Sequence, residues 1–351
     1  MAHIVAEGLS KVFGPDPRSV LPLLERGVGK DEILEQTGHT VGLLDVDVTV
    51  EPGETFVVMG LSGSGKSTLV RCFNRLIEPT SGTLTLDGTD VLALRPRELR
   101  EMRRSRMGMV FQRFALLPHR SVLDNVGFGL RVQGVARAER DRRAGAWVER
   151  VGLQGYERSL PRELSGGMQQ RVGLARALCT DPDVLLMDEA FSALDPLIRR
   201  EMQGELLRLQ QELGKTIVFI THDLDEALRL GDRIAVLKDG VVVQVGTPTE
   251  IVTRPADDYV KAFVEDVDRS RVMKVRHVMT PLGRDDADAA ASQADGAVLV
   301  SSEALLQDVV ADVAAAEGPV FAVDREGRPV GSVAARTVLA ALARGQQDAP
   351  S

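Results

Sequence analysis

The sequence predicts an α/β fold with a mostly parallel sheet, followed by a small α+β unit. Three short apolar runs, at residues 55–59, 184–187 and 217–220, have the length and β-branched composition of buried strands. Helical patterns separate these runs, and strands that alternate with helices are typical of a layered domain with parallel strands. The pattern stops after about residue 266 and ordered elements return near residue 297, which predicts a second, smaller unit.

Composition limits the class of protein. The 351 residues are enough for two domains, and 44% hydrophobic with 27% charged residues is ordinary for a chain with a sizeable core. The net charge of −8 gives no electrostatic reason to expect nucleic acid as the main partner. Cys72 and Cys179 lie far apart without a metal-ligand pattern, so we expect a reduced, cytosolic setting. We find neither a signal peptide nor an apolar stretch of about 18 residues, so any membrane crossing must come from another chain.

The first elements are a strand, an insertion and a second strand. Residues 4–13 predict an edge strand. Residues 15–40 form an insertion, in which glycines set off two short helices predicted at 19–25 and 30–36. The next strand is expected at 46–50, just before a Pro-Gly turn.

A phosphate-binding loop follows the strand at 55–59. It has the pattern G-x-x-x-x-G-K-[ST] and leads into a helix predicted from Lys66 to about Ile77. Glycines let backbone N–H groups approach phosphate oxygens, Lys66 places a cation at the β- and γ-phosphates, and Ser67 offers a hydroxyl to Mg²⁺. The alternative, a Gly/Ser-rich surface turn, is disfavoured because strand, loop and helix occur in order. The expected binding residues are Gly60, Ser62, Gly63, Ser64, Gly65, Lys66, Ser67 and Thr68.

The elements after this loop continue the alternation. Residues 82–89 predict a hairpin that turns at an Asp-Gly pair. A charged helix is expected at 95–106, a strand at 106–111 and a longer helix within 135–153. A second hairpin, predicted at 233–245, closes this part of the chain.

Two carboxylates stand at the end of the strand at 184–187. Asp188 suits Mg²⁺ coordination, directly or through water, and Glu189 is placed one residue further, where it can polarise an attacking water. A pair of solvated acids at a strand end is the alternative, and the phosphate loop in the same chain disfavours it. A phosphate loop alone leaves many enzymes open, kinases and GTPases among them, and this pair of carboxylates narrows the choice.

A second anion site is predicted where Ser165, Gly166 and Gly167 open a helix that runs to about residue 178. A helix N-terminus presents free N–H groups and a positive dipole end to an anion. A flexible, N-capped helix start is the alternative. Two anion sites in a chain with one nucleotide indicate that one of them serves another subunit.

Together these motifs resemble the ATP-binding-cassette ATPases over residues 2–266. Six motifs occur in the family's order: the phosphate loop, Gln112, Leu164-Ser-Gly-Gly167, Asp188-Glu189, Ser192-Ala-Leu-Asp195 and His222. The resemblance implies, within residues 1–266, a P-loop domain with a RecA-like core, an antiparallel β subdomain and a helical subdomain. It implies ATP and Mg²⁺ as ligands. It also implies a homodimer packed head to tail, with each ATP held between one phosphate loop and the other subunit's Ser165–Gly167.

The resemblance also assigns roles to single residues. Glu189, His222 and Lys66 are implied as catalytic, with His222 binding the γ-phosphate and holding Glu189 and the water in line. Gln112 is implied to sense Mg²⁺ and water and to link to a membrane partner, and Asp195 to contact the opposite subunit. Phe13 is implied to stack on adenine, although a buried core phenylalanine is a nearly equal interpretation.

The insertion and the runs at 59–68, 73–79 and 187–199 resemble the ATPase subunit of glycine betaine/proline importers. This implies an integral-membrane permease, contacted through residues 114–119, and an external solute-binding protein as partners. The place of work is then the cytoplasmic face of the cell membrane. An importer for another amine or amino acid, such as choline or carnitine, remains open, as does a soluble cassette ATPase without a transport role.

The tail resembles the CBS motif. Residues 297–345 match one such motif, with a helix capped by Ser302, a strand pair at 319–323 and 329–333, and a final helix at about 334–343. Residues 267–296, which include an Asp/Ala-rich stretch, predict a linker or a degenerate second half. Sensing of ionic strength or of a nucleotide, and a plain dimerisation or stability module, both remain open for this part.

Overall fold

The structure is a computed structural model that describes residues 3–112, 115–265, 267–282, 297–316, 318–324 and 326–343. The chain divides into two compact units, Met1–Thr247 and Pro248–Ser351, and each is described by itself. The sequence placed a boundary near residue 266, and that domain limit stays a prediction.

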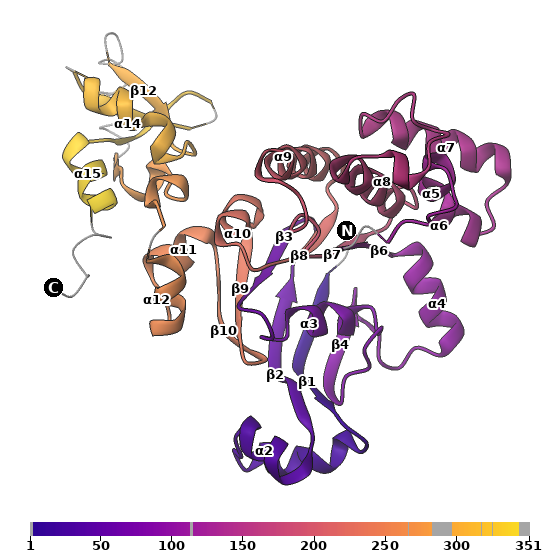
Figure 1. The fold of residues 1–351 in the computed structure, drawn as a ribbon. Coiled ribbons are helices and arrows are strands. Elements are labelled where there is room, and N and C mark those ends of the chain that lie inside the picture. The colour runs from indigo at the N-terminus through magenta and orange to yellow at the C-terminus, as the bar shows by residue number, and fades with distance from the viewer. Residues whose placement is uncertain are drawn as a thin grey trace. The chain divides into compact units, whose positions relative to one another are not determined.

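An antiparallel sheet of four strands begins the first unit (Figure 1). Its order is β2-β1-β4-β5, with β1 at Ile4–Phe13, β2 at Thr40–Val50, β4 at Ser81–Leu86 and β5 at Thr89–Asp90. The prediction that β1 is an edge strand was wrong, because β2 pairs with one side of it and β4 with the other. Both partners lie far along the sequence, so periodicity within residues 4–13 could not identify them.

The core of the first unit is a sheet of six strands in the order β10-β9-β3-β8-β7-β6. The strands are β3 (Thr55–Met59), β6 (Met107–Phe111), β7 (Val184–Asp188), β8 (Thr216–Thr221), β9 (Arg233–Lys238) and β10 (Val241–Gly246). All neighbours are parallel except the hairpin of β9 and β10, which confirms the predicted sheet. Every residue of β3, β7 and β8 is buried, which explains why their sequences are apolar without alternation.

The helices of the first unit fall into two sets, one that lies with the six-stranded sheet and one that packs around an apolar core of its own. The first set is α3 (Lys66–Phe73), α4 (Pro96–Ser105), α9 (Pro196–Leu213) and α10 (Leu224–Leu230). The second set, α5 (Val122–Val126), α6 (Phe128–Val132), α7 (Arg137–Arg150) and α8 (Gly166–Leu178), shares its own apolar core. Helix α3 stops four residues before the expected Ile77, because Arg75 adopts a left-handed backbone with φ of 52°.

The insertion between β1 and β2 contains the two predicted helices, α1 (Leu21–Glu25) and α2 (Lys30–Thr37). They pack around a small apolar cluster formed by Val12, Val20, Ile33 and Val41. In Figure 1 α2 lies at the end of the β1–β2 pair. The insertion is therefore a folded extension of this sheet.

The second unit is an α+β fold, as predicted. Its strands have the order β11-β14-β13-β12, with β11 at Thr280–Pro281, β12 at Val298–Ser301, β13 at Val320–Val323 and β14 at Pro329–Ser332. Its helices are α11 (Pro248–Thr253), α12 (Asp258–Val264), α14 (Leu306–Ala315) and α15 (Ala335–Ala343). The predicted Asp/Ala-rich linker lies outside the described residues.

Ser302 does not cap the helix that follows it. The cap position of α14 is Leu305, three residues later, and it provides no side-chain hydrogen bond. The backbone N–H of Ser302 instead donates to the carbonyl of Val323, at 2.9 Å. Ser302 therefore still belongs to the strand connection. Among the described residues of the chain, no helix is both long and apolar enough to cross a bilayer.

Candidate nucleotide-binding site

The phosphate loop connects β3 to α3, and its glycines are required by its geometry. Gly60, Gly63 and Gly65 have φ angles of 150°, 82° and 103°. A β-carbon on Gly60 would lie 2.2 Å from the carbonyl oxygen of Leu237, and one on Gly65 would lie 2.6 Å from that of Gly42. Only a residue without a side chain fits these two positions, so the loop is a preformed backbone cradle.

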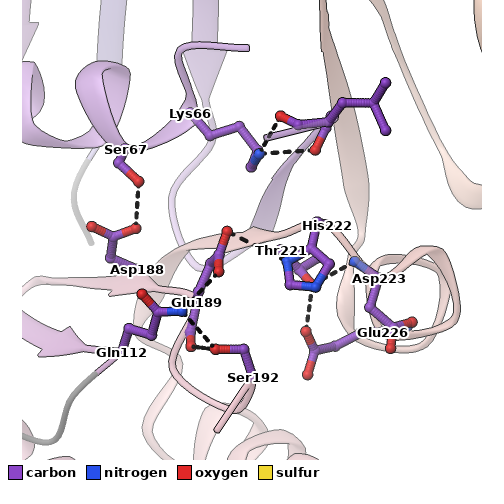
Figure 2. A network of polar contacts seen from close by, with 12 residues as sticks. Lys66, Ser67, Gln112, Asp188, Glu189, Ser192, Thr221, His222, Asp223 and Glu226 are labelled. Carbon is purple, nitrogen blue, oxygen red and sulfur yellow. Dashed lines mark hydrogen bonds and ion pairs between the residues drawn. The ribbon is translucent and has the colours of Figure 1, made fainter. Parts of the chain in front are cut away.

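The ammonium of Lys66 is held by the loop itself. Its Nζ donates to the carbonyl oxygens of Gly60 and Leu61, both at 2.8 Å (Figure 2). Burial lowers the pKa of Lys66, while Glu189 and Asp188 nearby raise it. The loop thus holds a cation next to its backbone N–H groups, in an arrangement suited to binding a polyphosphate.

The other predicted loop residues have different surroundings. Ser62 is exposed, and Thr68 is half-buried in the first turn of α3. Ser64 is buried and its Oγ has no hydrogen-bond partner among the described residues. The carbonyl of Ser64 accepts a hydrogen bond from the N–H of Gly240, at 2.8 Å, which fixes the loop to the β9–β10 turn.

Ser67 and Asp188 form a pair of oxygen donors beside the loop. The Ser67 hydroxyl donates to Asp188 Oδ1 at 2.8 Å, and Arg71 Nη2 lies 3.0 Å from Asp188 Oδ2. Asp188 is the last residue of β7 and is buried. Mg²⁺ is commonly bound through one or two such oxygens together with substrate phosphates and water, so the pair fits a magnesium ion.

Glu189 stands just beyond the end of β7 on a strained backbone. Its φ is 47°, which is uncommon outside glycine, and its N–H donates to the carbonyl of Ile220 at 3.2 Å. Its Oε1 lies 3.4 Å from His222 Nδ1, and Gln112 Nε2 donates to its Oε2 at 3.1 Å (Figure 2). Gln112, Glu189 and His222, which lie far apart in the sequence, therefore meet in one place.

Ser192 belongs to this group as well, although it was not predicted to be a site residue. Its Oγ accepts from Gln112 Nε2 at 3.1 Å and donates to the carbonyl of Glu189 at 2.9 Å. The signal was present in the Ser-Ala-Leu-Asp motif, of which only Asp195 received a role. Ser192 ties Gln112 to the backbone that carries the catalytic carboxylate candidate.

Ser165 and Asp195 act as helix caps within this chain. Ser165 Oγ accepts from Met168 N at 3.3 Å to begin α8, and Asp195 Oδ1 accepts from Leu197 N and Ile198 N to begin α9. No described hydrogen bond joins either residue to the group around Lys66. A β-carbon on Gly167 would lie 2.5 Å from Ile198 Cγ2, so glycine is needed where α8 meets α9.

Phe13 ends β1 with 38% of its surface exposed. The Lys11 ammonium lies 5.0 Å from its ring centroid. A β-carbon on Gly42 would lie 2.6 Å from its Cε2, so the ring rests on a glycine whose carbonyl faces Gly65. Phe13 is thus near the loop and half-open to solvent, and its stacking on adenine stays a prediction.

The comparisons with known proteins agree with this geometry. The ABC transporter family model matches residues 43–192. The glycine betaine transport ATP-binding protein OpuAA of Bacillus subtilis is 57% identical over 276 residues, covering 79% of this chain and 66% of that protein. The trimethylamine N-oxide transport ATP-binding protein TmoW of Pelagibacter ubique is 46% identical over 331 residues, 94% of both chains.

A solved structure gives the same result for the fold. It is a dimeric ATP-binding cassette in a post-hydrolysis state bound to ADP and Pi. It superposes with a TM-score of 0.59 at 31% identity, covering 70% of this chain and 98% of that one. The predicted cassette fold is therefore confirmed, and the chain belongs to the ATP-binding-cassette transporter family.

Proposed function

We propose that this chain is the ATP-hydrolysing subunit of an importer for glycine betaine, proline betaine or a related compatible solute. The observation that carries this proposal is the convergence of Lys66, Asp188, Glu189 and His222 around one loop. Similarity to ATP-binding proteins of glycine betaine transport supports the importer class. The chain works as a homodimer on the cytoplasmic face of the membrane, with a permease and, indirectly, an external solute-binding protein.

Binding of ATP is assigned to the phosphate loop and Lys66. Backbone N–H groups and the Lys66 ammonium bind the β- and γ-phosphates. Lys66 then gives up its hydrogen bonds to the two loop carbonyls and donates to phosphate oxygens instead. Ser67 and Asp188 are the residues that would hold Mg²⁺, which would neutralise charge on the phosphates. Their direct hydrogen bond supports this assignment because it places both oxygens at one point.

Hydrolysis is assigned to Glu189 with Gln112 and His222. The Glu189 carboxylate accepts the proton of the attacking water, and general bases of this kind contribute about 10²–10⁴-fold to rate. Gln112 orients that carboxylate through Oε2. His222, whose side chain is 57% exposed, is free to contact the γ-phosphate while its Nδ1 faces Glu189.

The remaining site residues are assigned to the dimer. The 13-residue helix α8 begins at Gly166 with Ser165 as its cap, which supports its N-terminus as the anion site for the partner subunit's ATP. Asp195 at the start of α9 is assigned to the contact with the opposite subunit. Residues 115–119 line the proposed permease contact, and the rest of that predicted segment lies outside the described residues.

Import of trimethylamine N-oxide is a second candidate. The alignment with the Pelagibacter ubique protein spans 94% of both chains, whereas the alignment with the Bacillus subtilis protein leaves a third of that protein unmatched. An ATPase subunit of this class does not contact the solute, so its own residues do not choose between the two amines.

Uptake measurements test both candidates. A host without its own osmolyte importers expresses this chain together with the proposed permease and solute-binding protein. Uptake of labelled glycine betaine and of labelled trimethylamine N-oxide is measured after a salt upshift. The wild type is compared with Glu189→Gln and with Glu326→Gln, an exposed glutamate of the second unit. We expect the wild type and Glu326→Gln to take up one of the two amines, and Glu189→Gln to take up neither. No uptake of either amine with all subunits present would reject both solutes, and equal uptake in Glu189→Gln would reject Glu189 as the base.

A further inference from the structure

Arg199 joins two loops of the candidate site. It lies one turn after the start of α9, where its N–H donates to the carbonyl of Asp195 at 2.9 Å. Its side chain turns back, and Nη2 donates to the carbonyl oxygens of Leu194 (3.2 Å) and Ser192 (3.4 Å). Nη1 donates to Asp223 Oδ2 at 3.2 Å. One guanidinium therefore holds the loop 192–195 and the residue that follows His222.

Each end of this connection leads directly to the catalytic group. On one side, Ser192 carries the hydrogen bonds to Gln112 and to the backbone of Glu189. On the other side, the N–H of Asp223 donates to Thr221 Oγ1 at 3.0 Å. These two residues flank His222, so the position of His222 depends on where Asp223 is held.

A second connection joins α9 to α10, the helix that Asp223 caps. Gln203 lies four residues after Arg199 on α9, and its Nε2 donates to Glu226 Oε1 at 3.0 Å. Glu226 Oε2 in turn accepts from Thr221 Oγ1. Gln203 and Glu226 are both buried, and burial raises the pKa of Glu226. Glu226 and Thr221 are thus fixed to α9 through Gln203. Arg199 holds Asp223, the residue next to His222.

The choice of arginine at this position has a chemical reason. A guanidinium presents five N–H donors in a planar fork and can hold carbonyls and a carboxylate together, which a lysine ammonium does less well. The Nε of Arg199 is buried without a hydrogen-bond partner in the described part of the chain. A buried donor without a partner costs free energy, so an apolar side chain would serve better if packing were the only role.

We propose that Arg199 is a positioning residue that couples the loop 192–195 to His222. When the dimer forms and Asp195 meets the opposite subunit, the guanidinium transmits the position of this loop to Asp223. His222 is thereby placed against Glu189 and the γ-phosphate. This inference rests on the proposed function, because it assumes ATP hydrolysis in a dimer.

ATP hydrolysis by the full-length chain, purified with its permease, provides the test. Arg199→Met and Arg199→Lys are compared with Arg208→Met, a matched change on the exposed side of the same helix. Arg208 pairs only with Glu205 and Glu212 of that helix among the described residues. We expect Arg199→Met to lower kcat about tenfold or more, with KM for ATP changed less than about twofold and a Hill coefficient close to 1. Arg199→Lys should be intermediate and Arg208→Met equal to the wild type.

A double substitution tests the path through Asp223. If Arg199 acts through that carboxylate, Asp223→Asn in the Arg199→Met background should lower kcat by a smaller factor than it does alone. Factors that multiply would overturn the proposal. A lowered melting temperature with unchanged kcat and Hill coefficient well below that temperature would also overturn it, because this is the result of a purely structural role.

Glu189→Gln separates this inference from the proposed function. If turnover is lost in Glu189→Gln but Arg199→Met matches Arg208→Met, the ATPase function stands and the role of Arg199 is rejected. If the wild type shows no turnover, or Glu189→Gln retains it fully, the proposed mechanism fails and the role of Arg199 fails with it.

Discussion

The two units of this chain place their polar side chains differently. Among the described residues, every buried polar or charged side chain except Ser270 belongs to the first unit. Lys66, Asp188 and Glu226 are among them, each held by hydrogen bonds. Burial of such groups costs free energy unless they are paired, so their concentration in one unit marks where the chemistry takes place. The second unit is built from apolar contacts and surface charges.

The same contrast appears in two glutamates. Burial raises the pKa of Glu226 in the first unit, whereas hydrogen bonds from Lys274 and Arg276 hold the pKa of Glu303 in the second unit below its usual value. Glu303 sits on the surface with 40% of its side chain exposed. The first unit therefore buries a carboxylate at a cost in desolvation, and the second uses exposed ion pairs that are individually weak.

The largest expected difference between the units comes from replacing a lysine in each. Lys66→Met removes the cation of the phosphate loop, and we expect ATP turnover to fall about a hundredfold or more. Lys261→Met removes an exposed lysine of α12 and should leave turnover unchanged. Steady-state phosphate release by both full-length variants measures this. Equal turnover in the two would remove the basis for placing the chemistry in the first unit.

A smaller difference is expected for stability. Asn125 is fully buried, and its side chain makes four hydrogen bonds to the backbone of Leu117, Arg120 and Ser121. Asn125→Ala leaves several of these groups unpaired, so we expect a loss of about 3 kcal/mol and a melting temperature lower by about 6–12 °C. Trp147, the only tryptophan, packs against the same helical core. Its fluorescence therefore reports this unfolding transition.

Ser270→Ala is the matched change in the second unit. Ser270 is buried, but its hydroxyl donates only to Asp268, at 2.6 Å, among the described residues. We expect a loss of about 1 kcal/mol or less. Hydrogen exchange of β13 and β14 measures it. A loss as large as that of Asn125→Ala would show that buried polar groups matter equally in both units.

The sequence predicted those parts of the site whose signals are local. The loop 60–68 and the strand ending at Asp188 are read from consecutive residues, because glycine spacing and apolar runs reflect the backbone they form. The contact between Glu189 and His222 was implied only by the resemblance, and the structure places Glu189 Oε1 3.4 Å from His222 Nδ1.

Residues that act across the fold were harder to predict. Ser192 and Arg199 make their contacts with segments up to 80 residues away, such as Gln112, and nothing in their neighbourhood encodes that partner. For the same reason β1 was mistaken for an edge strand. Ser302 was mistaken for a cap because its residue type favours caps, while backbone pairing with Val323 decides the outcome.

The two glutamates predict opposite responses to pH. The raised pKa of Glu226 means that its contribution to stability is present below its unfolded pKa, near 4.5, and is lost as pH rises through its folded pKa. The lowered pKa of Glu303 means that its contribution is present above about 4.5 and is lost as pH falls through its folded pKa.

Glutamine substitutions separate these responses. In the wild type the stability of the first unit should fall as pH rises, and Glu226→Gln should make this fall smaller. Denaturant titrations followed by Trp147 fluorescence at several pH values measure it. Glu303→Gln should flatten the decline of second-unit stability on acidification, measured by hydrogen exchange in β12. The same direction of change in both variants would contradict the contrast between buried and exposed carboxylates.

The smallest expected signal is the thiol reactivity of the native chain. Cys72 and Cys179 are both buried in the first unit, and burial raises the pKa of Cys72 to about 12 and that of Cys179 to about 11. At pH 8 only about one Cys72 thiol in ten thousand, and about one Cys179 thiol in a thousand, is the reactive thiolate. We therefore expect almost no reaction with a thiol reagent under native conditions, and two equivalents after denaturation.

A reporter cysteine in the second unit sharpens this measurement. Ala340 is exposed on α15, so Ala340→Cys should react within minutes and provide the rate for an accessible thiol. The ratio of the two rates measures how rarely the core of the first unit opens, because the buried thiols react only in an opened state. Fast reaction of Cys72 in the native chain would mean that the core under α3, the helix whose Ser67 contacts Asp188, opens readily. A preformed site would then be the wrong description, and the buried polar groups of the first unit would have to be ordered by the nucleotide itself.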